Sequence, residues 1–219
     1  MSTVEDIATL HQELLKDYPG DLTVLEVLER QAQTLLTEHQ NGNAVVCMQL
    51  SNWHPRFLRA RPEAILVAEF SLEDARLTVA REHGFQDWQQ VEMLDTVQFN
   101  PDFESAVDAI VSGDVDKLNA LLQQSPNLVR ETSPYAHKAT LLHYVAANGV
   151  EMWRQRAPAN AVAITQALIA AGAAVDAKMN VYGGQYDTMA LLMTSAHPAN
   201  AGLTEAIAAV LRDAGSSGT

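Results

Sequence analysis

The chain is poor in the residues that build disulfide frameworks, membrane spans and aromatic clusters. Its 219 residues include one cysteine, and aromatic residues make up 6% of the total. Cys47 therefore has no internal disulfide partner, and its apolar helical context predicts a small buried hydrophobe. No uncharged apolar run approaches the roughly 18–20 residues of a membrane span. The opening MSTVEDIATL lacks a basic region followed by an apolar one. No secretory signal is expected, and a cytoplasmic location is predicted.

Positive charge is also scarce. The chain has 14 Lys and Arg residues against 27 Asp and Glu residues, so its formal net charge is −13. Residues 1–129 hold 21 acidic and 8 basic side chains and supply the whole excess. Such a surface repels phosphate backbones, which argues against nucleic-acid binding. Solubility is the first explanation of the acidic faces. An acidic inhibitor of a basic partner is a weaker alternative.

Period-2 alternation is missing, whereas apolar residues recur at helical spacing along most of the chain. Ser71 opens a helical pattern that runs to His83 and is stopped by Gly84. Asp87 opens another that runs to about Val97, and Asp21 is expected to cap the helix over 22–36. The pattern predicts an all-α protein whose strands are confined to short hairpins.

Two segments of the chain share the same order of sequence features. Residues 31–58 and 102–129 each contain an apolar-periodic stretch, a glycine turn, a second apolar stretch, and then proline with an apolar pair. Gly42 and Gly113 are 71 residues apart, as are Pro55 and Pro126. This offset is about two units of the roughly 33–36 residues typical of paired-helix repeats. The spacing predicts an α-solenoid of stacked helix-turn-helix units with an open binding face.

Residues 139–177 carry a more specific pattern. The segment Ala139–Gly149 (ATLLHYVAANG) resembles the TPLHxAAxxG signature of the ankyrin repeat, and Ala167–Ala177 (ALIAAGAAVDA) resembles its LLxxGADVNA ending. The resemblance implies that Thr140 caps a first helix, that His143 bonds the neighbouring repeat's turn, and that Gly172 ends the second helix in the left-handed region. An insert, residues 150–160, separates the two helices.

The chain is similar to a group of bacterial ankyrin-repeat proteins over most of residues 22–216. The shared features are the segment from Glu73 to Trp88, LLHYVAANGVE, a Tyr-Gly-Gly hairpin, and a Ser-x-His-Pro insert at residues 195–198. The resemblance implies an N-terminal capping helix at 1–20, divergent helix pairs at 21–100, and about three ankyrin repeats at 101–216, the last two with inserts. It supplies a scaffold and no activity.

No enzyme signature is present. The chain has no nucleophile elbow, no glycine-rich phosphate loop before a helix, and no HExxH or CxxC spacing. We therefore expect no catalysis, no cofactor, no nucleotide and no metal. The alternative is a small-molecule binder or an unrecognised enzyme built from the polar inserts around Arg154 and His197. Its candidate residues are His143, Glu151, Arg156, Asn160 and His197.

The leading hypothesis is a protein-interaction scaffold that binds another protein through its concave face and hairpin loops. Loops between repeats carry aromatic residues that the core does not require, and tyrosine offers large contact area at small entropic cost. Each of these residues also has a purely structural explanation in turn chemistry or core packing. The predicted contact residues are Tyr135, His137, Trp153, Arg154, Tyr182, Gln185 and Tyr186.

Overall fold

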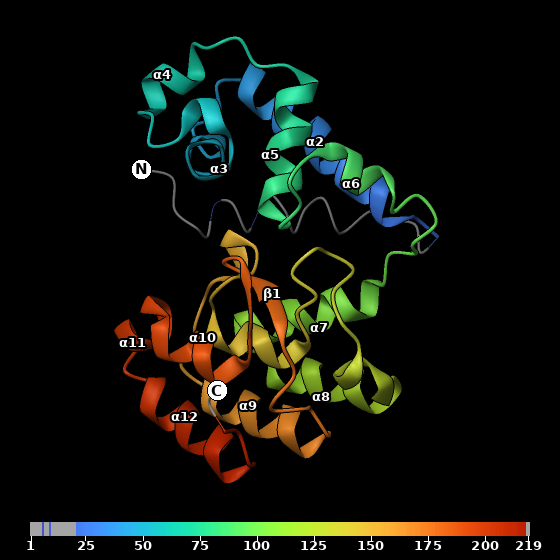
Figure 1. Ribbon diagram of the computed structural model, residues 1–219, viewed down its shortest axis with the longest axis vertical. Helices are drawn as coiled ribbons and strands as arrows, with labels where there is room; N and C mark the ends of the chain where they lie inside the picture. The colour runs from blue at the N-terminus through green and yellow to red at the C-terminus, as the bar shows by residue number, and fades with distance from the viewer. Residues whose placement is uncertain (1–5, 7–8, 10–20, 218–219) are drawn as a thin grey trace. The chain divides into compact units, whose positions relative to one another are not determined.

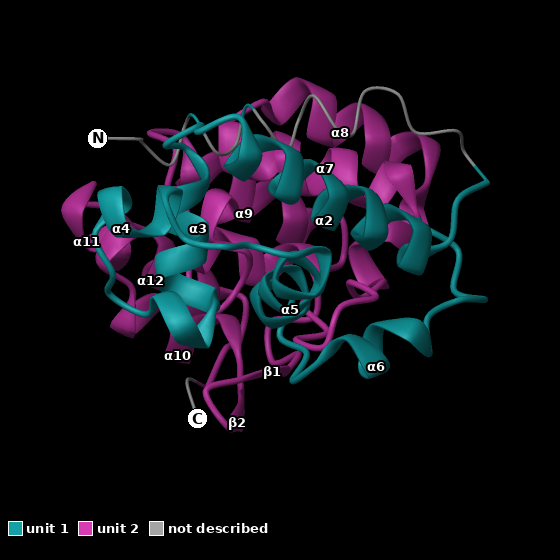
Figure 2. Ribbon diagram, turned by 90° about the horizontal axis from the view of Figure 1, so that it is seen from above, with its two compact units in different colours: residues 1–99 teal, residues 100–219 magenta. Residues whose placement is uncertain are grey.

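The computed structural model describes residues 6, 9 and 21–217 (Figure 1). The chain divides into two compact units, residues 1–99 and residues 100–219, each coloured separately in Figure 2. Both units are built mainly of helices, and the described residues contain one small two-stranded sheet. The mostly helical character predicted from the sequence is therefore confirmed. The predicted capping helix at 1–20 lies outside the described residues, except for residues 6 and 9.

The first unit is helical over its described residues. Its longest helix, α2, packs against α5, and α3 lies against both (Figure 1). A short antiparallel contact between Thr23 and Gln98 brings the two ends of residues 21–99 together. The elements are α2 (Val24–Gln40), α3 (Val46–Trp53), η1 (Pro55–Phe57), α4 (Pro62–Leu66), α5 (Leu72–Glu82) and α6 (Trp88–Glu92).

The helix starts in this unit follow from side-chain capping. Ser71 and Asp74 form the capping box of α5, as the sequence predicts. Asp87 caps α6 as predicted, but that helix ends at Glu92 and does not continue to Val97. The predicted cap at Asp21 is wrong. Thr23, two residues after Asp21, is the N-cap of α2 and forms a reciprocal capping box with Glu26.

The second unit places a short 3₁₀ helix, η3, at its centre. This helix contacts α7, α9 and α10, and its six residues are all buried. The elements are α7 (Pro101–Ser112), α8 (Val115–Gln124), η2 (Pro126–Arg130), η3 (Leu141–Ala146), η4 (Met152–Arg154), α9 (Ala161–Ala170), β1 (Met179–Val181), β2 (Gly184–Tyr186), α10 (Thr188–Thr194), α11 (Ala196–Asn200) and α12 (Thr204–Asp213).

The ankyrin-like segment departs from its expected helix at this point. The resemblance implies an α-helix after Thr140, whereas the structure has the tighter 3₁₀ helix η3. The helix stops because Ala147 adopts the left-handed region, with φ of 48°. Gly149 follows at φ of 75°, and a Cβ atom there would lie 2.8 Å from a methyl group of Val181. The backbone at Gly149 therefore lies close to the Val181 side chain of β1, just after the helix has ended at Ala146.

The two segments predicted to share a layout have the same order of elements. In each, a glycine with positive φ lies just after the first helix, with φ of 72° at Gly42 and 86° at Gly113. A second helix follows, and Pro55 or Pro126 then opens a 3₁₀ turn. Proline fits the first turn of a helix because it has no N–H to leave unsatisfied.

Gly172 provides a test of the helix ends in the second unit. It follows α9 with φ of 96°, and only one atom outside its neighbourhood, Arg130 Nη2 at 3.9 Å, lies within 4 Å of a Cβ placed there. Since space is available, the cost of a side chain comes from the backbone. We expect Gly172→Val to lower the free energy of unfolding by about 1–2 kcal/mol. Gly172→Asn should lose less, because asparagine tolerates this region. Urea denaturation measures both, and an unchanged midpoint for the valine variant would contradict the assignment.

Candidate functional site

The β1–β2 hairpin is the most exposed of the predicted contact regions. Its strands pair antiparallel with Met179 opposite Tyr186 and Val181 opposite Gly184, so the turn contains only Tyr182 and Gly183. Both turn residues have positive φ, 54° and 76°, as a type I′ turn requires. The sequence reading placed the two tyrosines around a Gly-Gly turn. In the structure Gly184 belongs to the strand, and Tyr182 itself occupies a turn position.

Tyr182 is held in an unfavourable backbone conformation with its ring facing solvent. The left-handed region costs a bulky L-residue roughly 1–2 kcal/mol, and asparagine or glycine normally fills this turn position. The side chain is nevertheless 70% exposed. Its hydroxyl donates to Asn148 Oδ1 at 2.6 Å. Asn148 Nδ2 in turn donates to the Leu191 carbonyl at 3.0 Å, which ties the hairpin tip to α10.

The rest of the hairpin adds further exposed surface. Tyr186 is 37% exposed, and its ring lies across Gly184, where a Cβ atom would come within 3.0 Å of it. Gln185 is exposed between them. Met193, in the α10 helix that Asn148 contacts, is 53% exposed. We call Tyr182, Gln185, Tyr186 and Met193 the hairpin surface.

Four of the predicted contact residues are buried instead. Tyr135, His137, Trp153 and Arg154 are between 1% and 4% exposed. The prediction that they touch a partner directly is therefore wrong. The insert at 150–160 folds inward at η4, because its arginine meets acidic groups of the core.

Arg154 is the centre of a buried ionic cluster. Its guanidinium lies 2.6 Å from Glu104 and 3.3 Å from Asp108, both on α7, and 3.9 Å from Glu151. Burial disfavours ionisation of Arg154, but the three carboxylates outweigh it and raise the pKa of Arg154 well above its usual value. Burial raises the pKa of Glu104, despite the opposing guanidinium. The arrangement neutralises a buried cation and leaves no positive charge for a ligand.

His137 connects this cluster to the hairpin. The Ala139 N–H donates to His137 Nδ1 at 3.0 Å, so the ring proton lies on Nε2 and is donated to Glu151 Oε1 at 3.1 Å. The His137 carbonyl accepts the Asn180 N–H at 2.7 Å. His137 therefore positions β1 from beneath and is not a surface contact.

The alternative polar residues are largely committed to separate structural contacts. His143 Nδ1 accepts the Thr140 N–H at 3.0 Å, and its Nε2 lies 3.0 Å from the Ala177 carbonyl. That second contact is the bond to a following turn that the ankyrin resemblance implies. Asn160 donates to the Gly113 carbonyl at 2.7 Å, at the end of α7.

The remaining two alternative residues do not complete a site. Arg156 is half-buried, and His197 is exposed on α11. Within residues 21–217, neither of them makes a hydrogen bond or ion pair with His143 or Asn160. The contacts of His143 and Asn160 are local and do not join these two residues into one site.

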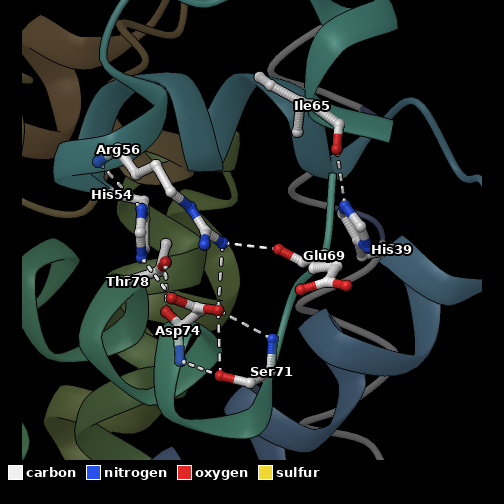
Figure 3. Close-up of polar contacts among 8 residues, drawn as sticks. All are labelled: His39, His54, Arg56, Ile65, Glu69, Ser71, Asp74 and Thr78. Atoms are coloured by element: carbon white, nitrogen blue, oxygen red, sulfur yellow. Dashed lines mark hydrogen bonds and ion pairs between the residues drawn. The ribbon is translucent and has the colours of Figure 1, made fainter. Parts of the chain in front are cut away.

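The first unit contains a histidine–aspartate pair that the sequence reading missed. His54 Nε2 lies 3.1 Å from Asp74 Oδ1, and His54 Nδ1 accepts the Arg56 N–H at 3.2 Å (Figure 3). Asp74 Oδ2 also accepts from Ser71 N–H at 2.9 Å and from the Arg56 guanidinium at 3.2 Å. Burial lowers the pKa of His54, although Asp74 opposes the shift. Both ring nitrogens hold the fold, so the pair fastens the 54–71 segment to α5.

The same unit has a surface pocket of about 510 Å³. Trp88 is one of the residues that line it. Arg76 lies 5.6 Å from the Trp88 ring centroid and donates two hydrogen bonds to Glu29, at 2.8 and 2.7 Å. The lining residues are Leu25, Glu26, Glu29, Arg30, Arg76, Trp88 and Glu92.

Comparison with known proteins gives no family. No family model, curated protein or solved structure matches the chain. In the part of the chain that the structure describes, no three acidic, histidine or cysteine side chains are grouped to hold a metal ion. No helix among those residues is both long and apolar enough to cross a bilayer.

Replacing Arg154 tests the ionic cluster. Arg154→Met removes the cation and leaves Glu104 and Glu151 buried without it, and losing one partner of a buried pair costs about 3–5 kcal/mol of folding free energy. Arg212→Met is the matched control, because its pair with Glu205 is exposed at 53% and 78% and such pairs contribute roughly 0–1 kcal/mol. Equal denaturation midpoints for the two variants would show that the cluster is not needed for stability.

His143 makes the stability of the second unit dependent on pH. Burial lowers its pKa to about 4, with the Ala177 hydrogen bond opposing the shift. Below about pH 6.5 the unfolded chain binds a proton that the folded chain excludes. The stability is therefore fully present above that pH. It falls by at most about 1.4 kcal/mol per pH unit down to about pH 4. Denaturant unfolding of wild type and His143→Asn at pH 7.5 and 4.5 measures the difference. A variant with the same pH dependence as wild type would refute this role.

Proposed function

We propose that the protein is a non-enzymatic interaction module that binds another cytoplasmic protein through the hairpin surface. Support comes first from Tyr182, whose large ring is exposed at a turn position that favours asparagine or glycine. Strained backbone positions with exposed side chains are found preferentially at ligand contacts. The hydroxyl of Tyr182 has a structural role through Asn148, but the exposed ring does not contribute to the core, and recognition of a partner would account for it.

The geometry around the ring favours binding over simple turn formation. The Asn148 amide accepts the Tyr182 hydroxyl and anchors itself to α10 through Leu191. A tyrosine whose ring is fixed before binding loses little entropy when a partner packs on it. The surface thus has an aromatic residue held in place on a helical scaffold.

We propose further that the scaffold is ankyrin-like over residues 101–216. The contact from His143 to the Ala177 carbonyl supports this, as does the positive φ of Gly172. The predicted hairpin also forms after the second helix. The scaffold would differ from the ankyrin pattern in two ways. Its first helix is the short η3, and an insert at 150–160 follows that helix.

The alternative function, a small-molecule or catalytic site around Arg154 and His197, has less support. Arg154 is surrounded by three carboxylates, and His197 lies exposed on α11. The remaining alternative, an acidic inhibitor of a basic partner, relies on net charge alone.

Tyr182→Asn gives a sharp test. The change removes the ring and its hydroxyl bond to Asn148 but produces Asn-Gly, the preferred type I′ turn sequence. The better turn should offset the lost contact, so the hairpin should still fold. We expect partner binding to weaken by tenfold or more, since truncating an aromatic hot spot costs about 2 kcal/mol or more. Affinity capture with quantitative mass spectrometry, followed by titration of the captured protein, measures the effect.

The matched control shortens an exposed apolar side chain that lies outside the hairpin surface. Val67 is 84% exposed in the first unit, and Val67→Ala should leave both binding and stability unchanged. A partner that binds wild type and Tyr182→Asn equally well, at unchanged thermal stability, would exclude Tyr182 from the interface. The proposed function would then fail.

A further inference from the structure

The register of the hairpin determines which backbone groups of β2 are free. In a hairpin with a two-residue turn, the residues flanking the turn form a hydrogen-bonded pair, and the next pair does not. Val181 and Gly184 flank the turn, so Asn180 and Gln185 form the pair without mutual backbone bonds. Their N–H and C=O groups consequently point away from the hairpin, on opposite edges.

The edge on the β1 side is already occupied. The Asn180 N–H donates to the His137 carbonyl at 2.7 Å, which agrees with the outward direction expected from the register. The Asn180 side-chain amide also donates to the Ala136 carbonyl, at 3.3 Å. The loop at 136–138 thus covers β1, and His137 is itself fixed by the buried cluster.

The edge on the β2 side is open. Gln185 is exposed, and over residues 21–217 its backbone makes no hydrogen bond outside the hairpin. Its side chain donates to Asn180 Oδ1 at 3.1 Å across the strand pair and so does not cover the edge. An edge with a free N–H and C=O fits an extended chain, because a strand supplies both complementary groups at the required spacing.

The side chains around this edge indicate an uncharged occupant. Tyr182, Gln185, Tyr186 and Met193 carry no charge at neutral pH, although the whole chain has a net charge of −13. At the base of the hairpin, Lys178 and Asp187 form an ion pair, with Lys178 Nζ 2.8 Å from Asp187 Oδ2. A charged segment would lose hydration here without gaining a partner.

The ring of Tyr186 adds a place for one apolar side chain. It lies over Gly184 on one face of β2, and residues two apart on a strand share a face. A strand added beside β2 would bring alternate side chains onto that face. Contact with the ring would favour an apolar or β-branched residue there.

We propose that β2 accepts an extended, uncharged peptide segment of the partner protein, which pairs with the Gln185 N–H and C=O as an added strand. This inference depends on the proposed function, since it names the kind of segment that the hairpin surface binds. The backbone pairing sets the orientation of the segment, and the tyrosines select its side chains. Because β2 has only three residues, its backbone edge offers one pair of hydrogen bonds, and most of the selectivity falls to the rings.

Gln185→Pro tests strand addition directly. Proline removes the outward N–H but none of the hydrogen bonds between β1 and β2, and edge strands tolerate proline where the N–H faces solvent. Gln185→Ala is the matched control, because it also removes the side-chain amide yet keeps the N–H. Circular dichroism and thermal melting of both variants establish that the fold is retained.

The probe is a displayed library of random twelve-residue peptides selected on the wild-type chain. We expect enriched peptides without charge at their centre. They should bind Gln185→Ala within about threefold of wild type and Gln185→Pro at least tenfold more weakly. Alternate amides of an added strand point toward β2 and away from it. N-methylation of the amides that point toward β2 should abolish binding, whereas N-methylation of the amides that point away should not. Enriched peptides that bind Gln185→Pro as tightly as Gln185→Ala would overturn strand addition, as would a library without enriched peptides.

Two further outcomes are separable. If the captured partner loses affinity for Tyr182→Asn but not for Gln185→Pro, the proposed function stands and strand addition fails. If sedimentation shows a wild-type dimer that Gln185→Pro dissociates, the edge is occupied by a second copy of this chain, and the proposal of a partner segment is overturned.

Discussion

The buried guanidinium of Arg154 is the interaction on which the arrangement of the second unit depends. It draws Glu104 and Asp108 of α7 and Glu151 of the insert to one point. Through Glu151 it also holds His137, whose carbonyl fixes Asn180 of β1. A charge removed from water is tolerated only when its partners are close and correctly oriented. The insert, the 136–138 loop and the hairpin are therefore constrained together.

This constraint explains how an exposed hairpin can be a rigid surface. A two-stranded hairpin alone is marginally stable in water. Here β1 is pinned by His137, and the turn is tied through Tyr182 and Asn148 to α10. The strain at Tyr182 persists because contacts on both sides of the turn hold it. Support from within the unit thus permits an aromatic residue at a position where local preferences disfavour it.

The two units use histidine in the same way. In His54, His137 and His143, Nδ1 accepts a backbone N–H and Nε2 faces an oxygen. Burial lowers the pKa of His54 and of His143 and so favours the neutral ring that accepts this bond. Beside Asp74 and Glu151, His54 and His137 resemble parts of catalytic pairs, but both nitrogens of each ring are already committed. Geometry, and not residue type, separates a structural histidine from a reactive one.

The sequence alone determined the helical character, the capping box of α5, the hairpin at 179–186 and the helix-ending glycines, because capping, turn chemistry and apolar spacing are local. It also identified Tyr182, Gln185 and Tyr186 as loop residues. Only the tertiary structure decided that Tyr135, His137, Trp153 and Arg154 lie inside. For Arg154, the partners are carboxylates of α7 some 50 residues earlier in the chain. The same holds for the pairing of His54 with Asp74, which joins segments 20 residues apart. Local patterns specify elements, whereas long-range packing and charge neutralisation decide which side chains remain exposed.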